Sequence, residues 1–506
     1  MKIPSAAQIR DWDSYTIKNE PIDSVDLMER ASNTFCKWFK KRFPETKRQV
    51  LLICGPGNNG GDGLAIARML ALDHYEVKVW LCRVSEGLSP DAQTNLNRLQ
   101  ALRSIPIKML YVGDPFPEIP DRSYLIDALF GSGLNRPVGG YWATLIEQLN
   151  QVSATRIAVD IPSGLFTDRA PDGAVFQAEY TFSFERPKLA FFLPVSGAFA
   201  GEWETQSIGL HPDFESNIPN TYQYLTVDAI RARLHTRHKF DHKGSFGHSL
   251  IIAGSHGKIG AALLTAKACL RAGSGLVTIH APKCAYEILQ IGFPEAMCIC
   301  DSHQFVVSDV GNLAPFKAIG VGPGIGTNSL TERALHDLIE RSSVPLVVDA
   351  DAINILAKNY DWLRALPSGS ILSPHPKEFE RLVGPSASDF DRLNKLQQLA
   401  MEMELVIILK GANTAIADPE GRIFFNTTGN PGMATGGSGD VLTGILTGLL
   451  AQGYSSLDAA LVGVYLHGLA GDIAAELLEQ ESLLSGDLID YLGKAFGSIR
   501  HSGGLL

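Results

Sequence analysis

Two glycine-rich segments contain the residues best suited to chemistry. Near the start, CGPGNNGGDGLAIAR (54–68) follows an apolar stretch and leads into a helical pattern. Late in the chain, ATGGSGDVLTGILTGLL (434–450) has the same arrangement, with Asp440 in the first turn of the expected helix. Free backbone amides at a helix N-terminus bind anions such as phosphate. Both segments therefore predict a site for a ligand that carries phosphate.

The first segment resembles a dinucleotide fingerprint without completing it. GPGNNG (55–60) fits the pattern G-x-G-x-x-G. A hydride-transferring domain also places an acidic residue about 20 residues further on, after the second strand. Here the second predicted strand is followed by Arg83. Asn58, Asn59 and Asp62 instead add side-chain oxygens, which suit a hard cation. This combination argues against a dehydrogenase.

Two further predicted strands end in polar residues. DALFGSGLNRP (127–137) places Asp127 at a strand end before a glycine turn, and AVDIPSGL (158–165) does the same for Asp160 and Ser163. A single aspartate at such a position usually makes a turn. Ligands of doubly wound sheets, however, bind outside the carboxyl ends of the strands. Together with the strand before the segment 54–68, three strands therefore end in polar residues, which favours one shared ligand site.

The late segment is suited to phosphoryl transfer. The backbone amides of Gly436–Asp440 form an anion hole for a transferring phosphoryl group. Asp440 is placed to take a proton from an attacking hydroxyl. On its own, Asp440 would be explained as a carboxylate that stabilises the helix dipole, but GGSG in front of it favours the functional interpretation. No Walker A string occurs, so P-loop chemistry is excluded at motif level.

Strand and helix patterns alternate along both halves, which predicts an α/β protein with parallel sheets. A helix over 24–43 precedes the first series of strands, and a helix-rich end follows the second. The polar stretch around 205–240 interrupts the alternation, so we expect domains at 1–217 and 226–506. The predicted strands are 50–55, 77–82, 123–129, 156–162, 180–184, 248–254, 276–282, 318–324, 345–351, 370–376, 406–411 and 422–426.

Composition narrows the class of protein. The 506 residues carry a formal net charge of −10 without a basic stripe, which argues against a nucleic-acid partner. Seven scattered cysteines without a CxxC pair favour a reducing compartment, and the start of the chain lacks the apolar core of a signal peptide. No run of about 18 apolar residues predicts a membrane span. The segments 442–450 and 459–470 are expected to be buried helices, and the protein to be cytoplasmic.

The motifs of the first half, together with LMERA (27–31), resemble the NAD(P)H-hydrate epimerase family. The resemblance covers most of 1–215 and implies a Rossmann-like three-layer α/β/α sandwich. It implies a potassium ion (K+) held by Asn59, Asp127 and Ser163, and Asp160 as the catalytic acid or base. One departure is Ser132, where a threonine is common. The implied contacts to the hydrated nucleotide are Asn58, Asn59, Gly60, Gly61, Asp62, Gly131, Ser132, Gly133, Leu134, Asn135, Arg136, Pro137 and Asp160.

The second half resembles the ribokinase-like superfamily, and within it the ADP/ATP-dependent NAD(P)H-hydrate dehydratases, over roughly 228–500. The strings are GSHGKIGAALL (254–264), GVGPGIG (320–326), VVDADAINIL (347–356), SPHPKEFERL (373–382) and KGANT (410–414). The resemblance implies a magnesium ion (Mg²⁺) and either ADP or ATP, with ADP more usual among bacterial relatives. Glu378 would position magnesium or phosphate, or be a surface glutamate. The implied hydrate contacts are Ala261, Gly324, His375 and Asp440, and the implied nucleotide contacts are Lys410, Gly411, Ala412, Asn413, Thr414 and Gly439.

The two resemblances together imply a bifunctional repair enzyme. It would interconvert the R and S forms of hydrated NADH and NADPH (NADHX and NADPHX) and dehydrate the S form after phosphorylation of its C6 hydroxyl. Small molecules would be its partners, with neither nucleic acid nor membrane, and relatives suggest a homo-oligomer. Two alternatives stay open: a small-alcohol kinase fused to a nucleotide-binding domain, and a non-catalytic binding protein. The choice between ADP and ATP, and between the two hydrates, also stays open.

Overall fold

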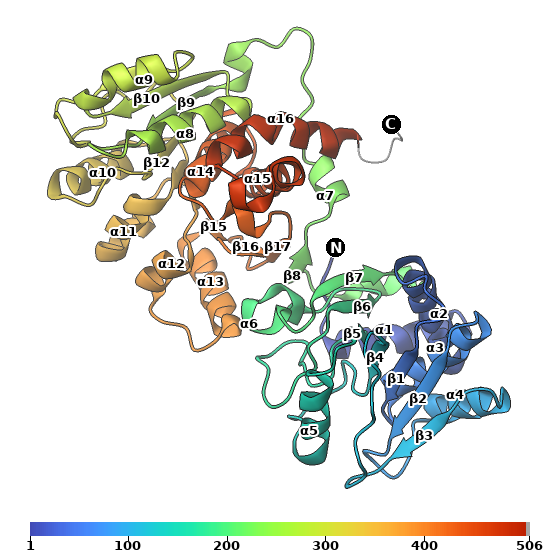
Figure 1. Cartoon of the computed structure of the whole chain (residues 1–506). Helices are drawn as coiled ribbons and strands as arrows, with labels where there is room; N and C mark the ends of the chain where they lie inside the picture. Colours follow the sequence, from blue (N-terminus) through green and yellow to red (C-terminus); the bar gives the residue numbers. More distant parts are fainter. Residues whose placement is uncertain (502–506) are drawn as a thin grey trace. The chain divides into compact units, whose positions relative to one another are not determined.

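The chain forms two compact units in the computed structural model, which describes residues 1–501 (Figure 1). The N-terminal unit comprises residues 2–222 and a short segment, 388–390. The C-terminal unit comprises residue 1, residues 223–387 and the chain from 391 onward. Each unit has its own sheet covered by helices, so the predicted fold class, two α/β domains, is confirmed.

The N-terminal unit is built on a parallel seven-stranded sheet with the order β3-β2-β1-β4-β5-β6-β7. The order reverses at β1, so the connections after β1 and β4 leave in opposite directions and open a crevice between them. The strands are β1 (Val50–Cys54), β2 (Val77–Cys82), β3 (Ile107–Leu110), β4 (Tyr124–Ala128), β5 (Thr155–Val159), β6 (Tyr180–Phe184) and β7 (Glu202–Gln206).

Helices cover both faces of this sheet, and β1 shows why. Every residue of β1 is buried. Leu52 and Cys54 pack in one apolar cluster with residues of α2, α3 and α4, whereas Leu51 and Ile53 pack on the other face with residues of α5. A strand that is apolar on both faces is typical of a parallel sheet between two helical layers. The helices are α1 (Ala6–Asn19), α2 (Ser24–Arg42), α3 (Asn58–Leu72), α4 (Pro90–Ala101), α5 (Gly140–Leu149) and α6 (Pro194–Gly197).

The C-terminal unit has a ten-stranded sheet with the order β11-β10-β9-β12-β13-β14-β15-β16-β17-β8. The strands from β11 to β15 in this order pair in parallel, and β15, β16 and β17 form an antiparallel meander. The strands are β8 (Tyr222–Tyr224), β9 (His248–Ile252), β10 (Leu276–Ala281), β11 (Met297–Cys300), β12 (Ala318–Val321), β13 (Leu346–Val348), β14 (Ile371–Leu372), β15 (Val406–Leu409), β16 (Thr414–Ala417) and β17 (Ile423–Asn426).

Helix α14 (Ser438–Ala451) is central to this unit, because it contacts β9, β12 and β13 and packs closely on α8 (Ile259–Arg271). At their closest approach, a Cβ on Gly444 would lie 2.1 Å from the carbonyl oxygen of Thr265. Only glycine allows this spacing. The other helices are α7 (Val227–Arg231), α9 (Tyr286–Gly292), α10 (Ser329–Arg341), α11 (Ala350–Lys358), α12 (Pro376–Val383), α13 (Asp389–Met403), α15 (Ser456–Leu478) and α16 (Ser485–His501).

Within residues 1–501, α15 is the one helix long and apolar enough to cross a membrane by length and composition. Polar residues interrupt the apolar stretch of this helix, so the sequence contains no continuous run of about 18 apolar residues there. It packs against α14 and α16 and against the strands β15, β16 and β17. Its composition therefore reflects burial in the core, and the expected buried helices at 442–450 and 459–470 are confirmed.

Five short strands were missed by the sequence analysis: β3, β7, β8, β11 and β16. Four of them, β3, β7, β8 and β11, lie at the edges of their sheets, and β7 and β11 are mostly accessible to solvent, whereas β16 is an inner strand of four residues. Strand prediction depends on runs of apolar residues, which edge strands do not need. All seven cysteines, which lie within residues 1–501, are free thiols.

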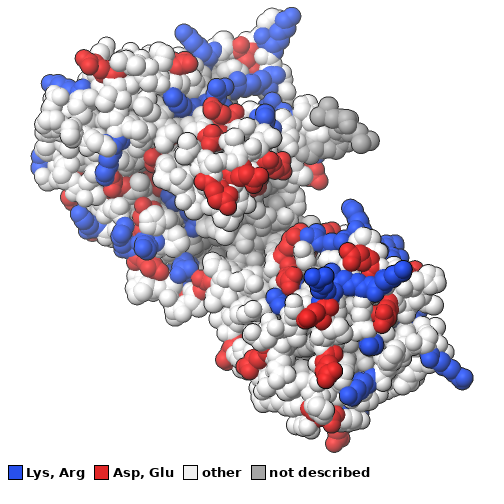
Figure 2. All heavy atoms as spheres, viewed as in Figure 1, with Lys and Arg blue, Asp and Glu red and all other residues white. Residues whose placement is uncertain are grey.

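Positive and negative side chains alternate on the face of the molecule drawn in Figure 2. No continuous basic stripe crosses that face, which agrees with the acidic overall charge.

Candidate active sites

The first candidate site joins the ends of β1, β4 and β5. The side chain of Asp127 is buried at the end of β4, and its two oxygens accept hydrogen bonds from the backbone NH (2.7 Å) and the hydroxyl (2.6 Å) of Ser163. The amide of Asn59 donates to the carbonyl oxygen of Phe130 (3.0 Å), whose NH donates to the Ser163 hydroxyl (2.8 Å). The three residues predicted to hold potassium therefore lie together, and they offer amide, carboxylate and hydroxyl oxygens.

The pKa of Asp127 reflects this setting. Burial raises it to about 6, and the hydrogen bonds from Ser163 and Leu129 oppose the rise. A nearby cation would favour the charged form of the same carboxylate. The donor set therefore fits a hard cation in its chemistry.

Asp160 lies just beyond β5 and is held in an unusual conformation. Its φ is +65°, in the left-handed region that non-glycine residues rarely adopt. Its carboxylate lies 2.7 Å from the ammonium of Lys188, which is itself buried and also donates to the carbonyl oxygens of Phe184 and Arg186. Strained residues of this kind collect at functional sites. The sequence analysis missed Lys188, because no motif surrounds it.

Two further carboxyl groups lie near Asp160. Burial raises the pKa of Asp13, in α1, to about 7, with the negative charge of Asp160 adding to the rise and Lys188 opposing it. Burial also raises the pKa of Asp62 well above its usual range, and Asp160 and Asp13 add to the effect. This site therefore combines a carboxylate paired with a lysine and two carboxyl groups whose pKa values are raised by burial. Asp62 was predicted to contact substrate, whereas Asp13 was not predicted.

The glycine loop between β1 and α3 is tightly folded, as its sequence suggests. A Cβ on Gly60 would lie 1.8 Å from the carbonyl oxygen of Gly55, so this turn requires glycine. Asn58 is the exposed first residue of α3. The second predicted loop, 131–137, is half-buried to exposed, and the carbonyl oxygen of Asn135 accepts a hydrogen bond from Arg169.

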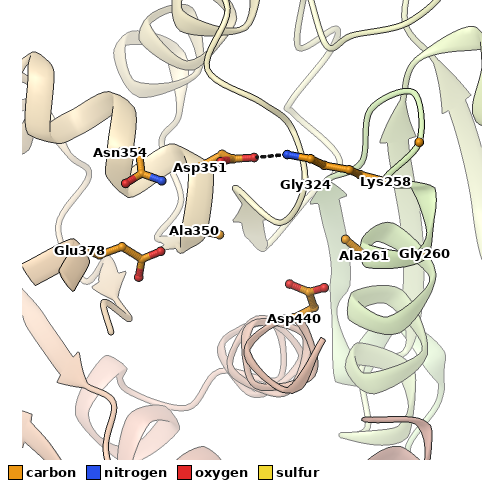
Figure 3. Close-up of a pocket in the computed structure, with 10 residues that line it drawn as sticks. Lys258, Gly260, Ala261, Gly324, Ala350, Asp351, Asn354, Glu378 and Asp440 are labelled. Carbon is orange, nitrogen blue, oxygen red and sulfur yellow. Dashed lines mark hydrogen bonds and ion pairs between the residues drawn. The ribbon is translucent and has the colours of Figure 1, made fainter. Parts of the chain in front are cut away.

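The second candidate site is a cavity of about 410 Å³ in the C-terminal unit (Figure 3). Asp440 enters it from the first turn of α14, and Ala261 faces it from α8. Three of the four residues predicted to contact the hydrate therefore line one cavity. The lining residues are Gly257, Lys258, Gly260, Ala261, Gly324, Ala350, Asp351, Asn354, Glu378 and Asp440.

An ion pair with a buried carboxylate lies next to two residues of this cavity, Ala350 and Asp440. The carboxylate of Asp349 lies 2.7 Å from the ammonium of Lys410 and accepts a hydrogen bond from the Thr443 hydroxyl (2.8 Å). A Cβ on Gly439 would lie 3.5 Å from both charged groups, so Gly439 borders the pair. Ala350, the residue after Asp349, has a φ of +49°. The ion pair with Asp349 therefore holds Lys410 next to α14, the helix that carries Asp440.

The surroundings of Asp440 favour a proton acceptor that works near neutral pH. Burial raises its pKa to about 6, with the charges of Asp349 and Asp351 adding to the rise and Lys410 opposing it. His467, in α15, supports the same helix end, because its Nε2 lies 3.0 Å from the carbonyl oxygen of Ser438. Burial lowers the pKa of His467 to about 4, so this ring is neutral. No sequence signal pointed to His467.

His375 has a structural role in α12. Its Nδ1 accepts hydrogen bonds from the backbone NH groups of Lys377 and Glu378, while the Glu378 carboxylate accepts one from the NH of His375. This reciprocal pair is a capping box. Glu378 lines the cavity, whereas His375 is not among the lining residues. Burial raises the pKa of Glu378.

The predicted nucleotide segment, 410–414, connects β15 to β16 at the sheet edge where the cavity lies. Gly411 and Ala412 are exposed, and the backbone NH of Gly411 lies 3.4 Å from the hydroxyl of Thr414. The side chain of Lys410 turns inward, toward Asp349. The exposed backbone is therefore available to a ligand, and contact with a nucleotide stays a prediction.

One cluster outside both sites has the composition of a metal centre: His280, Asp301 and Asp309. The carboxylate of Asp301 already accepts hydrogen bonds from the backbone NH groups of His303, Ser308 and Asp309. These and the Ser308 hydroxyl lower the pKa of Asp301 to about 2 despite its burial. These hydrogen bonds show that Asp301 organises the loop 303–309, and this structural role explains why the three residues lie together.

Comparison with known proteins agrees with this division into two sites. A family model described as YjeF-related protein N-terminus matches residues 24–190, and one described as NAD(P)H-hydrate dehydratase matches residues 249–494. The bifunctional NAD(P)H-hydrate repair enzyme Nnr of Moorella thermoacetica is 36% identical over 510 residues, covering 97% of this chain and 96% of the relative. The chain belongs to the family of bifunctional NAD(P)H-hydrate repair enzymes.

A second relative of the same name, from Coxiella burnetii, is 34% identical over 498 residues and covers 96% of this chain and 97% of the relative. Among solved structures, the ADP/ATP-dependent NAD(P)H-hydrate dehydratase of Bacillus subtilis, co-crystallised with ATP and Mg²⁺, is 29% identical with a TM-score of 0.48. It covers 55% of this chain and 98% of that chain. The two family models and the full-length relatives confirm the family predicted from the motifs of both halves.

Proposed function

We propose that this hydrate repair enzyme uses its two units for two successive reactions. Residues 1–217 would interconvert the R and S epimers of NADHX and NADPHX, and residues 226–506 would dehydrate the S epimer at the expense of ADP or ATP. The observation that carries the proposal is the setting of Asp440. Its pKa is raised to about 6, and it lines the same cavity as Ala261 and Gly324.

In the dehydratase reaction, Asp440 takes the proton of the C6 hydroxyl as that oxygen attacks the terminal phosphoryl group of the nucleotide. The backbone amides at the start of α14 stabilise the negative charge on the moving group. Phosphate is a far better leaving group than hydroxide. The lone pair of the ring nitrogen then expels phosphate, and loss of a proton restores the double bond and reduced nicotinamide.

The remaining predicted contacts complete this proposal. Ala261, Gly324 and His375 would contact the hydrate, and Gly439 with residues 410–414 would contact the adenine nucleotide. Mg²⁺, when bound, neutralises phosphate oxygens, and Glu378 is the buried carboxylate of the cavity that would hold it. Its raised pKa indicates a carboxylate that gains from a nearby positive charge.

In the epimerase reaction, Asp160 acts as acid or base at the hydrated ring carbon. Lys188 fixes the carboxylate of Asp160 through their 2.7 Å ion pair. The loops 58–62 and 131–137 would hold the nucleotide on either side of the crevice. Asn59, Asp127 and Ser163 would hold K+, which supplies a fixed positive charge beside the substrate. A cytoplasmic homo-oligomer is the form that we propose for the working enzyme.

A single assay tests the proposal. Mixed R and S hydrate is incubated with the enzyme and either ADP or ATP, and recovery of reduced nicotinamide is followed by its absorbance. D440N should abolish recovery while hydrate and nucleotide still bind, because the base is lost and the shape is kept. D160N should repair the S epimer at the normal rate and leave the R epimer to spontaneous epimerisation.

The outcomes separate the alternatives. A stable phosphorylated product without reduced nicotinamide would identify a small-alcohol kinase instead. Tight binding of hydrate without turnover by the unaltered chain would identify a binding protein. Full activity of D440N would remove the proposed base from the mechanism.

A further inference from the structure

The charged side chains that line the dehydratase cavity are acidic except for one. Asp351, Glu378 and Asp440 are three carboxylates among its lining residues. Among the described residues that line it, Lys258 is the one with a positive charge. A dinucleotide hydrate carries negatively charged phosphates, so its binding to such a cavity needs a cationic partner.

Lys258 combines a fixed backbone with a free side chain. Its backbone NH donates to the carbonyl oxygen of Ser255, and its own carbonyl oxygen accepts a hydrogen bond from the NH of Ala261. Its carbonyl oxygen and Cβ also lie against Gly324, at 3.1 and 3.2 Å from where a Cβ on that glycine would be. The side chain, by contrast, is 56% exposed. The attachment point is therefore rigid, whereas the ammonium group can move.

The present partner of Lys258 holds it weakly. Its ammonium lies 3.5 Å from the carboxylate of Asp351, across the top of the cavity as drawn in Figure 3. An exposed ion pair at this distance contributes little free energy. The Asp351 carboxylate keeps a shorter hydrogen bond, 2.8 Å, from the backbone NH of Gly326. Lys258 can therefore leave Asp351 without leaving a carboxylate unpaired.

The position of Lys258 favours a contact with the hydrate over a contact with ADP or ATP. It lies on the wall formed by Ala261 and Gly324, the residues assigned to the hydrate, whereas Glu378 lies on the opposite side of the cavity (Figure 3). The predicted nucleotide segment begins with Lys410, which is engaged by Asp349. Lys258 therefore lies on the side of the cavity assigned to the hydrate, away from the segment assigned to ADP or ATP.

We propose that Lys258 exchanges Asp351 for a phosphate group of the dinucleotide hydrate and so anchors this substrate in the dehydratase site. The inference rests on the proposed dehydratase function. The phosphate belongs either to the pyrophosphate, which NADHX and NADPHX share, or to the 2′-phosphate, which only NADPHX carries.

The test is steady-state dehydration of S-NADHX and S-NADPHX by the full chain and by K258M. We expect KM for hydrate to rise about tenfold with kcat nearly unchanged, because the contact is made equally in ground state and transition state. KM for ADP or ATP should not change. An equal rise for both hydrates assigns the pyrophosphate, and a rise confined to NADPHX assigns the 2′-phosphate.

Two variants control the experiment. K258R should restore a hydrate KM close to the original value, since it keeps the positive charge. K358M removes an exposed lysine from the far end of α11 and should behave as the unaltered chain. Unchanged KM for both hydrates in K258M, or a raised KM for the nucleotide alone, would overturn the inference. Loss of turnover in the unaltered chain would instead overturn the proposed function.

Discussion

At the scale of single residues, each site places a carboxylate near a lysine, of which Lys410 belongs to a sequence motif and Lys188 does not. Asp160 pairs with Lys188, and Asp440 lies near Lys410, which the buried Asp349 holds. The two cases differ in charge balance. Asp160 is paired directly, whereas burial raises the pKa of Asp440 to about 6, and the negative charges of Asp349 and Asp351 add to the rise.

This pKa predicts a pH dependence of the dehydratase. Asp440 must be ionised to accept a proton, so kcat/KM should fall as the pH decreases through about 6. D351N removes one of the negative charges that raise this pKa, and the midpoint should move to lower pH. The measurement is a pH profile of S-hydrate dehydration between pH 5 and 8. A midpoint that moved upward in D351N would contradict this assignment of charges.

At the scale of elements, α14 positions Asp440 in the dehydratase cavity. Its close packing on α8 leaves no room for a side chain at Gly444. The Gly444 contact fixes how closely the two helices approach, and each helix contributes to the cavity, through Asp440 and Ala261 respectively. A change at Gly444 should therefore disturb both walls of the dehydratase site while it spares the N-terminal unit.

We expect Gly444→Ala to destabilise the C-terminal unit by about 1–3 kcal/mol, because its Cβ would overlap the backbone of α8. Dehydratase activity should decrease, and epimerase activity should persist. Gly493→Ala, in α16, is the matched control: no atom lies within 4 Å of its would-be Cβ, and it should be neutral or stabilise by up to about 1 kcal/mol. Thermal unfolding measures both. Equal melting temperatures for the two variants would refute the packing argument.

Element patterns also explain what could be predicted from the sequence. The strand–glycine–helix segments at 54–68 and 434–450 are local, so spacing alone located them. Lys188 and His467 act on residues about 28 and 29 positions away along the chain, and nothing near them in sequence marks their partners. The capping of α12 by the Nδ1 of His375 was likewise not predicted, and contact of His375 with the hydrate stays a prediction.

At the scale of the whole molecule, the connection between the units contains structure of its own. β8 belongs to the sheet of the C-terminal unit although it precedes the bulk of that unit, and the NH of Leu225 donates to the carbonyl oxygen of Phe425. Leu225 is buried in the core that α14, α15 and α16 share. The stable form of the dehydratase unit should therefore include this strand.

Two fragments test this extension. A fragment of 226–506 lacks β8 and Leu225, whereas a fragment of 220–506 keeps them. Burial of one leucine contributes about 1.5–3 kcal/mol, so we expect the shorter fragment to melt about 5 °C lower. Both should dehydrate the S hydrate, since both contain every lining residue of the cavity. Identical melting temperatures would show that β8 adds no stability.

The ends of the N-terminal unit lie beside each other. The NH of Ile3 donates to the carbonyl oxygen of Tyr222 (2.9 Å), and the NH of Tyr224 donates to that of Met1 (2.7 Å). The chain thus returns to within hydrogen-bonding distance of its own start after more than two hundred residues. Domains whose ends lie close together tolerate circular permutation, because a short turn can join the two ends without stretching the chain. The N-terminal unit should therefore keep its fold when new ends are opened in one of its exposed loops.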